Sequence, residues 1–166
     1  MSISIGIGQD THAFAPEGST RPLVLGGVTF PGERGLAGHS DADVVAHAIA
    51  DALLGAARLG DIGQHFPDND PAYAGADSLK LLAQVTKLLT GRGFRILDVD
   101  CVVQAERPRL AEYRQLMRER LSQAMNLEPS AVGVKATTCE GLGAIGRAEG
   151  IAATAVALLE RDTDSA

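Results

Sequence analysis

Apolar and polar residues alternate at the start of the chain, where Ile3, Ile5 and Ile7 are separated by small or polar residues. A period of two is typical of a β-strand, and this strand leads into Asp10 and His12. Alternation or β-rich composition predicts further strands at 96–105, 131–137 and 151–159, and either a strand or one arm of a hairpin at 22–29.

Other segments follow the period of an α-helix. The first is predicted to begin at Ser40, which can cap a helix N-terminus, and to end at Gly55 or Gly60. The second opens at Asp77-Ser78, carries leucines along one face and ends near Gly91. Between these two helices the chain is rich in Asp, Gly and Pro, which predicts a structured loop.

A third helix is expected after Pro108, because proline suits the first turn of a helix. Its apolar stripe consists of Leu110, Tyr113, Met117, Leu121 and Ala124. Since strands and helices interleave along the chain, we expect an α/β or α+β domain built around one sheet.

Composition narrows the class of protein. The chain has 166 residues, and 21 acidic residues against 15 Lys and Arg give it a formal charge of -6. It is long enough to form its own core, and we expect one domain over 1–166 with a frayed tail at 161–166. The acidic balance argues against a protein that coats nucleic acid or an anionic membrane.

Localisation is expected to be cytoplasmic. The two cysteines, Cys101 and Cys139, are too few for a disulfide framework and lack the spacing of a redox motif, which fits a reducing compartment. The first residues lack the basic and apolar regions of a signal peptide. The late apolar run 151–159 is too short to span a bilayer.

Three residues are candidates for a metal site. Asp10 and His12 are two apart on a predicted strand, so their side chains share one face. His47 on the first helix offers a third ligand, and one Asp with two His suits zinc while leaving a fourth position open for substrate. Asp43 or Asp51, four residues on either side of His47, can orient its imidazole. The alternative is that Asp10 and His12 only hydrogen-bond to each other.

Phosphate chemistry is indicated at two places. His39 and Ser40 precede a helix, where free amides and the helix dipole favour anions, although Ser40 can equally be only a cap. After a predicted strand, adjacent threonines and Glu140 can hold phosphate oxygens and a hard cation such as Mg²⁺. Arg147 either adds a phosphate contact or pairs with Glu149. The order of residues is not that of a Walker loop.

Several other polar residues have a simpler interpretation. The arginines between Arg107 and Arg120 are interleaved with glutamates, which favours a solvated helix face over an RNA-binding surface. Carboxylates at 61–63 and 66–70 can bind hydroxyl groups, but turn chemistry explains them equally well. His65 receives no role.

A long, ordered set of segments resembles the 2-C-methyl-D-erythritol 2,4-cyclodiphosphate synthase family of the non-mevalonate isoprenoid pathway, along nearly the whole chain. This match is far more specific than any single motif. The matching blocks are Gly8–Phe14, Leu25–Gly27, His39–Asp43 running into His47, Asp51–Ala56, Leu59–Gly63, Phe66–Asp70, Gly75–Ser78, Lys135–Thr138, Gly146–Arg147 and Glu149–Ala152.

The resemblance implies a reaction and an assembly. The reaction converts 4-diphosphocytidyl-2-C-methyl-D-erythritol 2-phosphate to 2-C-methyl-D-erythritol 2,4-cyclodiphosphate and CMP, by attack of the 2-phosphate on the β-phosphorus. The enzyme would be a phosphorus-oxygen lyase. Each subunit would be a single α+β domain with α/β-type layers, in which one mixed β-sheet packs against helices. The assembly would be a homotrimer whose sheets face the threefold axis and whose active sites lie at subunit interfaces, with no nucleic-acid or membrane partner.

The resemblance also assigns roles to residues. Asp10, His12 and His47 would bind one zinc ion per subunit, and Glu140 would hold Mg²⁺ or Mn²⁺ with the substrate. His39 and Thr138 would stabilise the transition state. Implied substrate contacts are Asp10, Thr11, His12, His39, Ser40, Asp61, Ile62, Gly63, Phe66, Pro67, Asp68, Asn69 and Asp70. Implied cytidine and phosphate contacts are Ala105, Glu106, Arg107, Pro108, Arg109, Leu110, Ala111, Thr137, Thr138, Cys139, Glu140, Ala144 and Arg147.

Two departures and two rival functions accompany this resemblance. Ala144 and Gln9 stand where relatives can carry aromatic residues near the central cavity, so binding of an isoprenoid diphosphate there is not implied. One rival function is a zinc-dependent phosphohydrolase of a nucleotide-diphospho-polyol, which transfers the β-phosphate to water. The other is a trimeric binding module whose zinc is purely structural.

Overall fold

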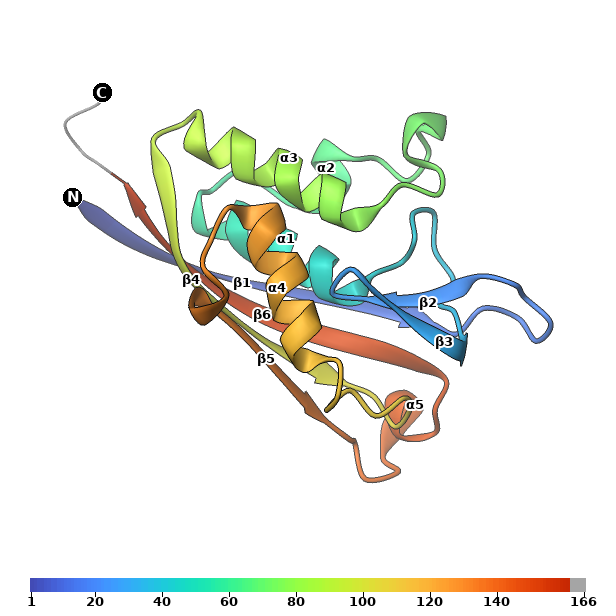
Figure 1. Ribbon diagram of the computed structural model, residues 1–166. Helices are drawn as coiled ribbons and strands as arrows, with labels where there is room; N and C mark the ends of the chain where they lie inside the picture. The colour runs from blue at the N-terminus through green and yellow to red at the C-terminus, as the bar shows by residue number, and fades with distance from the viewer. Residues whose placement is uncertain (162–166) are drawn as a thin grey trace.

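The computed structural model describes residues 1–161, and a four-stranded mixed sheet runs through it (Figure 1). The strand order is β1-β6-β4-β5, in which β1 and β4 are antiparallel to β6 while β4 and β5 are parallel. This arrangement confirms the predicted α+β class and the strand interpretation of 151–159. The strands are β1 (Ser2–Ala13), β4 (Phe94–Gln104), β5 (Val132–Thr137) and β6 (Gly150–Arg161).

A separate hairpin and several helices complete the fold. The segment at 22–29 forms a hairpin of β2 (Pro22–Leu25) and β3 (Val28–Arg34). Three longer helices, α1 (Val44–Ala56), α3 (Ser78–Thr90) and α4 (Arg114–Met125), all lie on one face of the sheet in Figure 1. The short elements are α2 (Ile62–His65), η1 (Pro71–Tyr73), η2 (Pro129–Ala131) and α5 (Gly143–Gly146).

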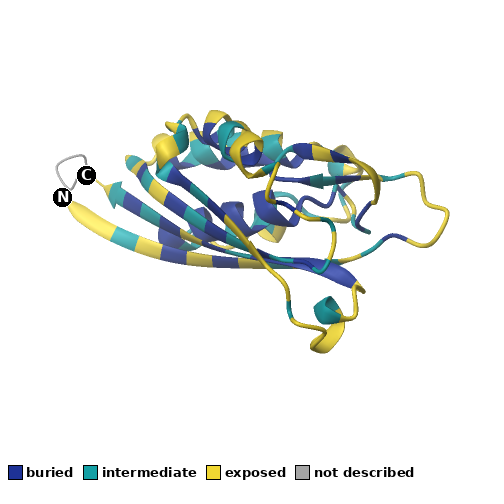
Figure 2. Ribbon diagram, turned by 60° about the horizontal axis from the view of Figure 1, so that its bottom comes forward, coloured by how far each residue is buried: buried dark blue, intermediate teal, exposed yellow. Residues whose placement is uncertain are grey.

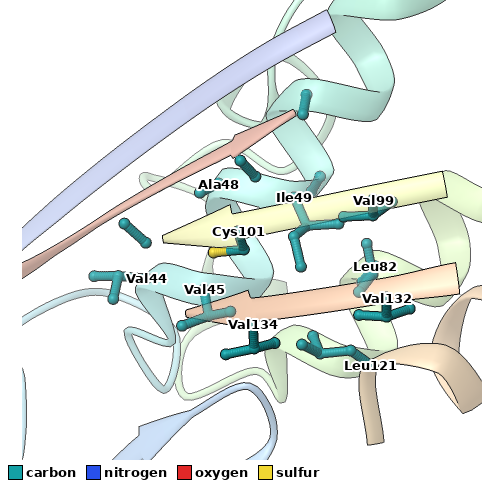
Figure 3. Packing of buried hydrophobic residues seen from close by; sticks show 14 of the residues in the cluster. Val44, Val45, Ala48, Ile49, Leu82, Val99, Cys101, Leu121, Val132 and Val134 are labelled. Atoms are coloured by element: carbon teal, nitrogen blue, oxygen red, sulfur yellow. The ribbon is translucent and has the colours of Figure 1, made fainter. Parts of the chain in front are cut away.

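The hydrophobic core lies between this covered face and the helices (Figure 3). Val45 and Ile49 of α1, Leu82 of α3 and Leu121 of α4 are all buried in it. The predicted shared face of Val99, Cys101 and Val103 on β4 is confirmed, because all three are buried.

The opposite face of the sheet is uncovered in the single chain (Figure 2). Ile3, Ile5 and Ile7 are 53%, 64% and 65% exposed, and Val156 of β6 is 38% exposed. The alternation on β1 therefore predicted a strand correctly, but the residues it buries under α1 are glycines and not isoleucines. An apolar sheet face of this kind in a folded chain marks a surface for association.

Two predicted helix starts are wrong. Asp43, and not Ser40, caps α1, because its side chain accepts hydrogen bonds from the amides of Val45 and Ala46. The hydroxyl of Ser40 instead accepts from the amide of Ala42, whose φ of 59° places the chain in a turn. The helix therefore starts only after this turn.

Pro108 likewise lies outside α4, which begins at Arg114. Residues 105–113 form a loop because Leu110 turns into the core, where it is 3% exposed. The rest of the predicted stripe is confirmed: Met117 and Leu121 are buried, and Tyr113 and Ala124 pack against the core.

The remaining predictions about element ends are confirmed or fall outside the described part. Asp77 caps α3 through the amide of Leu79, and Gly91 follows its last turn. Arg161 is the last residue of β6, and the rest of the expected tail, 162–166, lies outside the described residues. Within 1–161, no helix has the length and apolar character needed to cross a membrane.

Candidate metal and nucleotide site

The predicted metal ligands come together at the end of β1. Asp10 and His12 lie on the helix-covered face of β1, and His47 reaches them from α1. Asp10 Oδ2 is 3.0 Å from His12 Nε2 and 3.0 Å from His47 Nδ1. The three candidate ligand atoms all lie within 4.8 Å of one another, and all three residues are half-buried.

The free ring nitrogens of the two histidines also have partners. His12 Nδ1 lies 2.6 Å from the carbonyl oxygen of Ala37. His47 Nε2 lies 2.8 Å from the hydroxyl of Ser78, the first residue of α3. Partners at these positions fix the orientation of imidazoles that bind metals.

Neither Asp43 nor Asp51 orients His47, so both of these alternatives are wrong. The carboxylate of Asp43 is fully buried and accepts from backbone amides at the start of α1 and in the β2–β3 turn. Asp51 accepts from the amide of Ile62 at 2.7 Å and so holds the start of α2. Spacing within one helix suggested these two residues, but it cannot predict a partner from another element. The partner is Ser78, which belongs to α3.

Asp10 and His12 shift each other's pKa values, and each favours the charged form of its partner. Burial alone raises the pKa of Asp10, but hydrogen bonds and charge attraction from His12 and His47 outweigh it and hold this pKa well below its ordinary value. The hydrogen bond with Asp10 in turn raises the pKa of His12, against the effect of burial. The metal-free cluster therefore favours an ionised carboxylate beside a protonated His12.

The donor set suits a zinc ion. Two imidazole nitrogens and one carboxylate oxygen form a common zinc set, and three protein ligands leave a fourth position for another oxygen. The site also opens into a pocket of about 560 Å³. Asp10, His12 and His47 would hold the ion, and the open position would face this pocket.

Most of the residues that the resemblance implied as substrate contacts, apart from the cytidine contacts, line this metal pocket. His39 and Ser40 lie beside the metal ligands, and residues of the α2 region and of the following loop form the opposite wall. The predicted residues lining it are Asp10, His12, His39, Ser40, Ile62, Gly63, Phe66, Pro67, Asp68 and Asn69; Gly38, Tyr73 and Leu81 were not predicted.

The segment carrying His39 and Ser40 is held in place from two sides. His39 Nε2 lies 3.0 Å from the carbonyl oxygen of Asp70, across the pocket loop. Arg21 donates to the carbonyl oxygens of Gly38, at 3.0 Å, and of Ser40. No motif pointed to Arg21, because its role depends on a contact between segments far apart in sequence.

A second pocket of about 400 Å³ lies where β4 and β5 end. Register places the two pockets at the same end of the sheet: His12 pairs with Ile151, Gln104 with Ala152, and Gln104 with Thr137. With strands about 4.8 Å apart, His12 and Thr137 are separated by about 14 Å. The predicted lining residues are Ala105, Glu106, Pro108, Arg109, Leu110, Ala111, Thr137 and Thr138.

The loop after β5 contacts this second pocket, which we call the nucleotide pocket because the resemblance implies cytidine contacts there. Glu106 Oε1 accepts from the amide of Cys139 at 2.7 Å. Thr138 donates to Glu140 at 3.1 Å, and Glu140 is exposed with a φ of 52°. Thr138 and Glu140 are therefore hydrogen-bonded beside the pocket, and of the two only Thr138 lines it.

Other predicted site residues lie outside the two pockets. Arg147 pairs with Glu149 at 2.6 Å, as one of its two interpretations expected. Thr11 and Ala144 are exposed, and Arg107 is also exposed next to the nucleotide pocket. Gln9 lies on the uncovered face of the sheet, 3.4 Å from the hydroxyl of Thr154.

Some polar residues have structural roles. Asp61 and Asp70 cap α2 and η1, which is the turn chemistry considered above. His65 Nε2 lies 2.8 Å from the carbonyl oxygen of Leu59. Arg118 donates to the carbonyl oxygens of Val132 and Pro129, which supports the non-RNA interpretation of the arginine-rich stretch.

A small α+β domain with a candidate Asp-His-His metal site and two pockets at one end of its sheet is typical of a metal-dependent enzyme that acts on a small molecule. Residues 3–160 match the profile of the YgbB family. Two relatives, each called 2-C-methyl-D-erythritol 2,4-cyclodiphosphate synthase, come from Cyanothece sp. and Rubrobacter xylanophilus. The Cyanothece protein is 57% identical over 95% of this chain and 96% of its own length. The Rubrobacter protein is 56% identical over 95% of this chain and 94% of its own length. The chain belongs to this synthase family.

Solved structures show the same fold. A 2C-methyl-D-erythritol-2,4-cyclodiphosphate synthase in a CDP-bound form has a TM-score of 0.84 at 38% identity, covering 94% of this chain and 99% of its own. IspF of Plasmodium falciparum in complex with CDP has a TM-score of 0.84 at 32% identity, with 98% of both chains covered. The bifunctional IspDF of Campylobacter jejuni reaches 0.91 at 41% identity over 97% of this chain, which spans 43% of that longer protein.

Proposed function

We propose that this protein converts 4-diphosphocytidyl-2-C-methyl-D-erythritol 2-phosphate to 2-C-methyl-D-erythritol 2,4-cyclodiphosphate and CMP, in the non-mevalonate isoprenoid pathway. The observation that carries the proposal is the convergence of Asp10, His12 and His47 in a pocket with His39 and Ser40. The 57% identity to synthases over nearly the whole chain supports it.

The chemistry balances within one substrate molecule. An oxygen of the 2-phosphate forms a bond to the β-phosphorus, and the bond from that phosphorus to the oxygen bridging the α-phosphate breaks. CMP leaves with the electron pair. The nucleophile is already an anion, so no side chain has to act as a base, and closing a ring within one molecule supplies much of the proximity that the reaction needs.

The protein then has to bring the substrate's phosphates together and neutralise their negative charge. A zinc ion held by Asp10, His12 and His47 would act as a Lewis acid on a phosphate oxygen. We assign two donors to the charge that develops in the transition state: His39 at the metal pocket and Thr138 at the second pocket. Ser40 is assigned as a phosphate contact. The hydrogen bond that His39 Nε2 donates to the carbonyl oxygen of Asp70 holds the ring at the pocket wall.

We assign the residues around the second pocket to the cytidine and its phosphates. Glu140 would hold Mg²⁺ or Mn²⁺, since such ions commonly use one carboxylate together with substrate phosphates. The exposed Glu140 accepts a hydrogen bond from Thr138, which lines the second pocket. Two relatives of this chain carry CDP in their solved structures, which supports the assignment.

We propose that the enzyme is a homotrimer with active sites at subunit interfaces. The uncovered sheet face supports association, because it exposes Ile3, Ile5, Ile7 and Val156. The separation of about 14 Å between the metal ligands and the nucleotide pocket leaves room for a neighbour to supply one of the two. We place the enzyme in the cytoplasm because both cysteines are free.

The association is tested by changing the exposed apolar face. Ile5→Asp is expected to yield monomers in sedimentation or light-scattering measurements, because a charge at the centre of an interface remains unpaired. Leu116→Asp is the matched control: Leu116 is 41% exposed, but it lies on α4, away from the sheet face. An Ile5→Asp protein with the mass of the unchanged protein would contradict the proposal.

Product analysis tests the reaction. Incubation with the diphosphocytidyl substrate is expected to yield CMP and a cyclic diphosphate, identified by phosphorus NMR. A linear phosphorylated erythritol would instead support the phosphohydrolase. His47→Ala should abolish turnover; if it leaves turnover intact, the zinc is structural and the proposed mechanism is wrong.

A further inference from the structure

The imidazole of His47 is held at both ring nitrogens by different elements. Nδ1 faces Asp10 of β1 at 3.0 Å, and Nε2 faces the hydroxyl of Ser78 at 2.8 Å. Ser78 is 1% exposed and starts α3, while His47 lies in α1. The orientation of a metal-ligand candidate is therefore set by a side chain outside the metal pocket.

The hydrogen bonds in this cluster have a definite direction. The hydroxyl of Ser78 donates to a carboxylate oxygen of Asp41, which can only accept. Since a hydroxyl has one proton, the oxygen of Ser78 can then only accept from His47 Nε2. An imidazole that binds a metal is neutral, and with its proton on Nε2 its lone pair lies on Nδ1, the nitrogen that faces Asp10. A metal ion would then take the place of the hydrogen bond between Nδ1 and the carboxylate.

Asp41 is fixed firmly enough to impose this direction. Its second carboxylate oxygen accepts from the amide of Ser78 at 3.0 Å, and its own amide donates to the carbonyl oxygen of Ala76 at 3.0 Å. It also accepts from the amide of Asp43 at 3.2 Å. These hydrogen bonds join the segment before α1 to the start of α3. The relay of hydrogen bonds from His47 through Ser78 to Asp41 is therefore fixed at both helices.

Ser40 offers a weaker alternative partner. Its hydroxyl oxygen lies 3.2 Å from His47 Nε2, longer than the 2.8 Å to Ser78, and it already accepts from the amide of Ala42. Ser40 lines the metal pocket, whereas Ser78 does not. The two hydroxyl oxygens lie 3.5 Å apart. Ser78 is therefore the nearer partner of His47, and Ser40 is the hydroxyl that a ligand in the pocket can reach.

We propose that Ser78 and Asp41 are positioning residues, which fix the tautomer and orientation of His47 so that Nδ1 points at the metal. The inference rests on the proposed function only in taking Asp10, His12 and His47 as the zinc ligands. It extends the set of residues needed for the metal site to α3, which contributes no ligand.

The test measures zinc affinity and needs no substrate. Ser78→Ala removes the acceptor for Nε2, and removing such a partner typically weakens metal binding about 10-fold to 100-fold. We expect a loss in this range when the metal-free full chain competes for zinc with a coloured chelator. Asp77→Ala is the matched control, because it removes the cap of α3, at the amide of Leu79, without touching His47. Thermal unfolding of both variants measures the loss of stability separately.

Two results would overturn the proposal. One is a Ser78→Ala protein that binds zinc as tightly as the unchanged protein, or no more weakly than Asp77→Ala. The other comes from the unchanged, zinc-loaded protein and does not depend on a variant that folds. Nitrogen-15 NMR should show metal on Nδ1 of His47 and a slowly exchanging proton on Nε2; metal on Nε2 would exclude the relay. Neither result depends on whether the enzyme cyclises its substrate.

Discussion

Gly8 of β1 lies directly against Ala48 of α1: a Cβ at Gly8 would stand 2.0 Å from the carbonyl oxygen of Ala48. This close approach brings His47 within reach of Asp10. We predict that Gly8→Ala forces α1 away from β1, destabilises the protein by at least about 2 kcal/mol and weakens zinc binding. Chemical denaturation and a zinc competition titration measure the two effects.

Gly55→Ala is the matched control on the same interface. A Cβ there would lie 3.8 Å from the carbonyl oxygen of Ile7, an ordinary contact distance. Because alanine also favours the helix over glycine, we expect unchanged zinc affinity and stability that is equal or greater by up to about 1 kcal/mol. Equal effects of the two substitutions would show that helix–strand separation does not control the metal site.

Asp43 is predicted to be a principal anchor of α1. One carboxylate oxygen accepts from the amides of Gly26, Val45 and Ala46, and the other accepts from Gly27 at 2.7 Å. Asp43→Ala leaves these buried donors unpaired and removes the helix cap, so we expect a loss of about 2–4 kcal/mol in the free energy of unfolding.

Asp43→Asn separates the two parts of this effect. The amide oxygen can keep the three bonds on one side, while its NH₂ group faces the donor of Gly27 and loses only that bond. We expect about half the loss measured for Asp43→Ala by denaturant titration. If the alanine and asparagine variants lose the same free energy of unfolding, the oxygen that accepts three hydrogen bonds is not what stabilises the start of α1.

The sequence predicted the elements well because each is encoded locally. The alternation of β1, the cap at Asp77 and the stripe through Met117 and Leu121 depend on neighbours within a few residues. Asp10, His12 and His47 could be grouped from spacing because a strand places alternate side chains on one face. The family resemblance then extended these three to a complete site.

Contacts between distant segments could not be predicted in this way. Ser78 looks like a helix start, and only the packing of α3 against the segment before α1 places it 2.8 Å from His47. The same holds for Arg21, which reaches the carbonyl oxygen of Gly38. The first helix began late because the carboxylate of Asp43 bonds to the β2–β3 turn as well as to α1, a preference that spacing does not reveal.

The two cysteines are predicted to differ in reactivity. Cys101 is buried in the core, and burial raises the pKa of its thiol to about 12, so hardly any thiolate forms. Cys139 is half-buried at the loop beside the nucleotide pocket. We expect a thiol reagent to modify one cysteine per folded chain and a second only after unfolding. Cys139→Ser should remove the first reaction; fast modification that persists in this variant would place Cys101 within reach of solvent.

The Asp10–His12 pair is predicted to give the metal-free protein a window of greater stability on the acidic side of neutrality. The pKa of Asp10 lies below its usual value, so its contribution is present above about pH 4 and is lost as the pH falls. The pKa of His12 is raised, so its contribution is complete below about pH 6.5 and is lost as the pH rises through the folded-state pKa.

The difference in melting temperature between the unchanged protein and Asp10→Asn isolates this pair. Measured with a chelator present, that difference should be largest between about pH 4 and 6.5. It should shrink at pH 3, because Asp10 takes up a proton in the unfolded chain while it stays ionised in the folded one, and at pH 9, because His12 loses its proton in the folded protein. A difference that keeps growing from pH 6.5 to 9 would mean that the carboxylate does not hold a proton on His12.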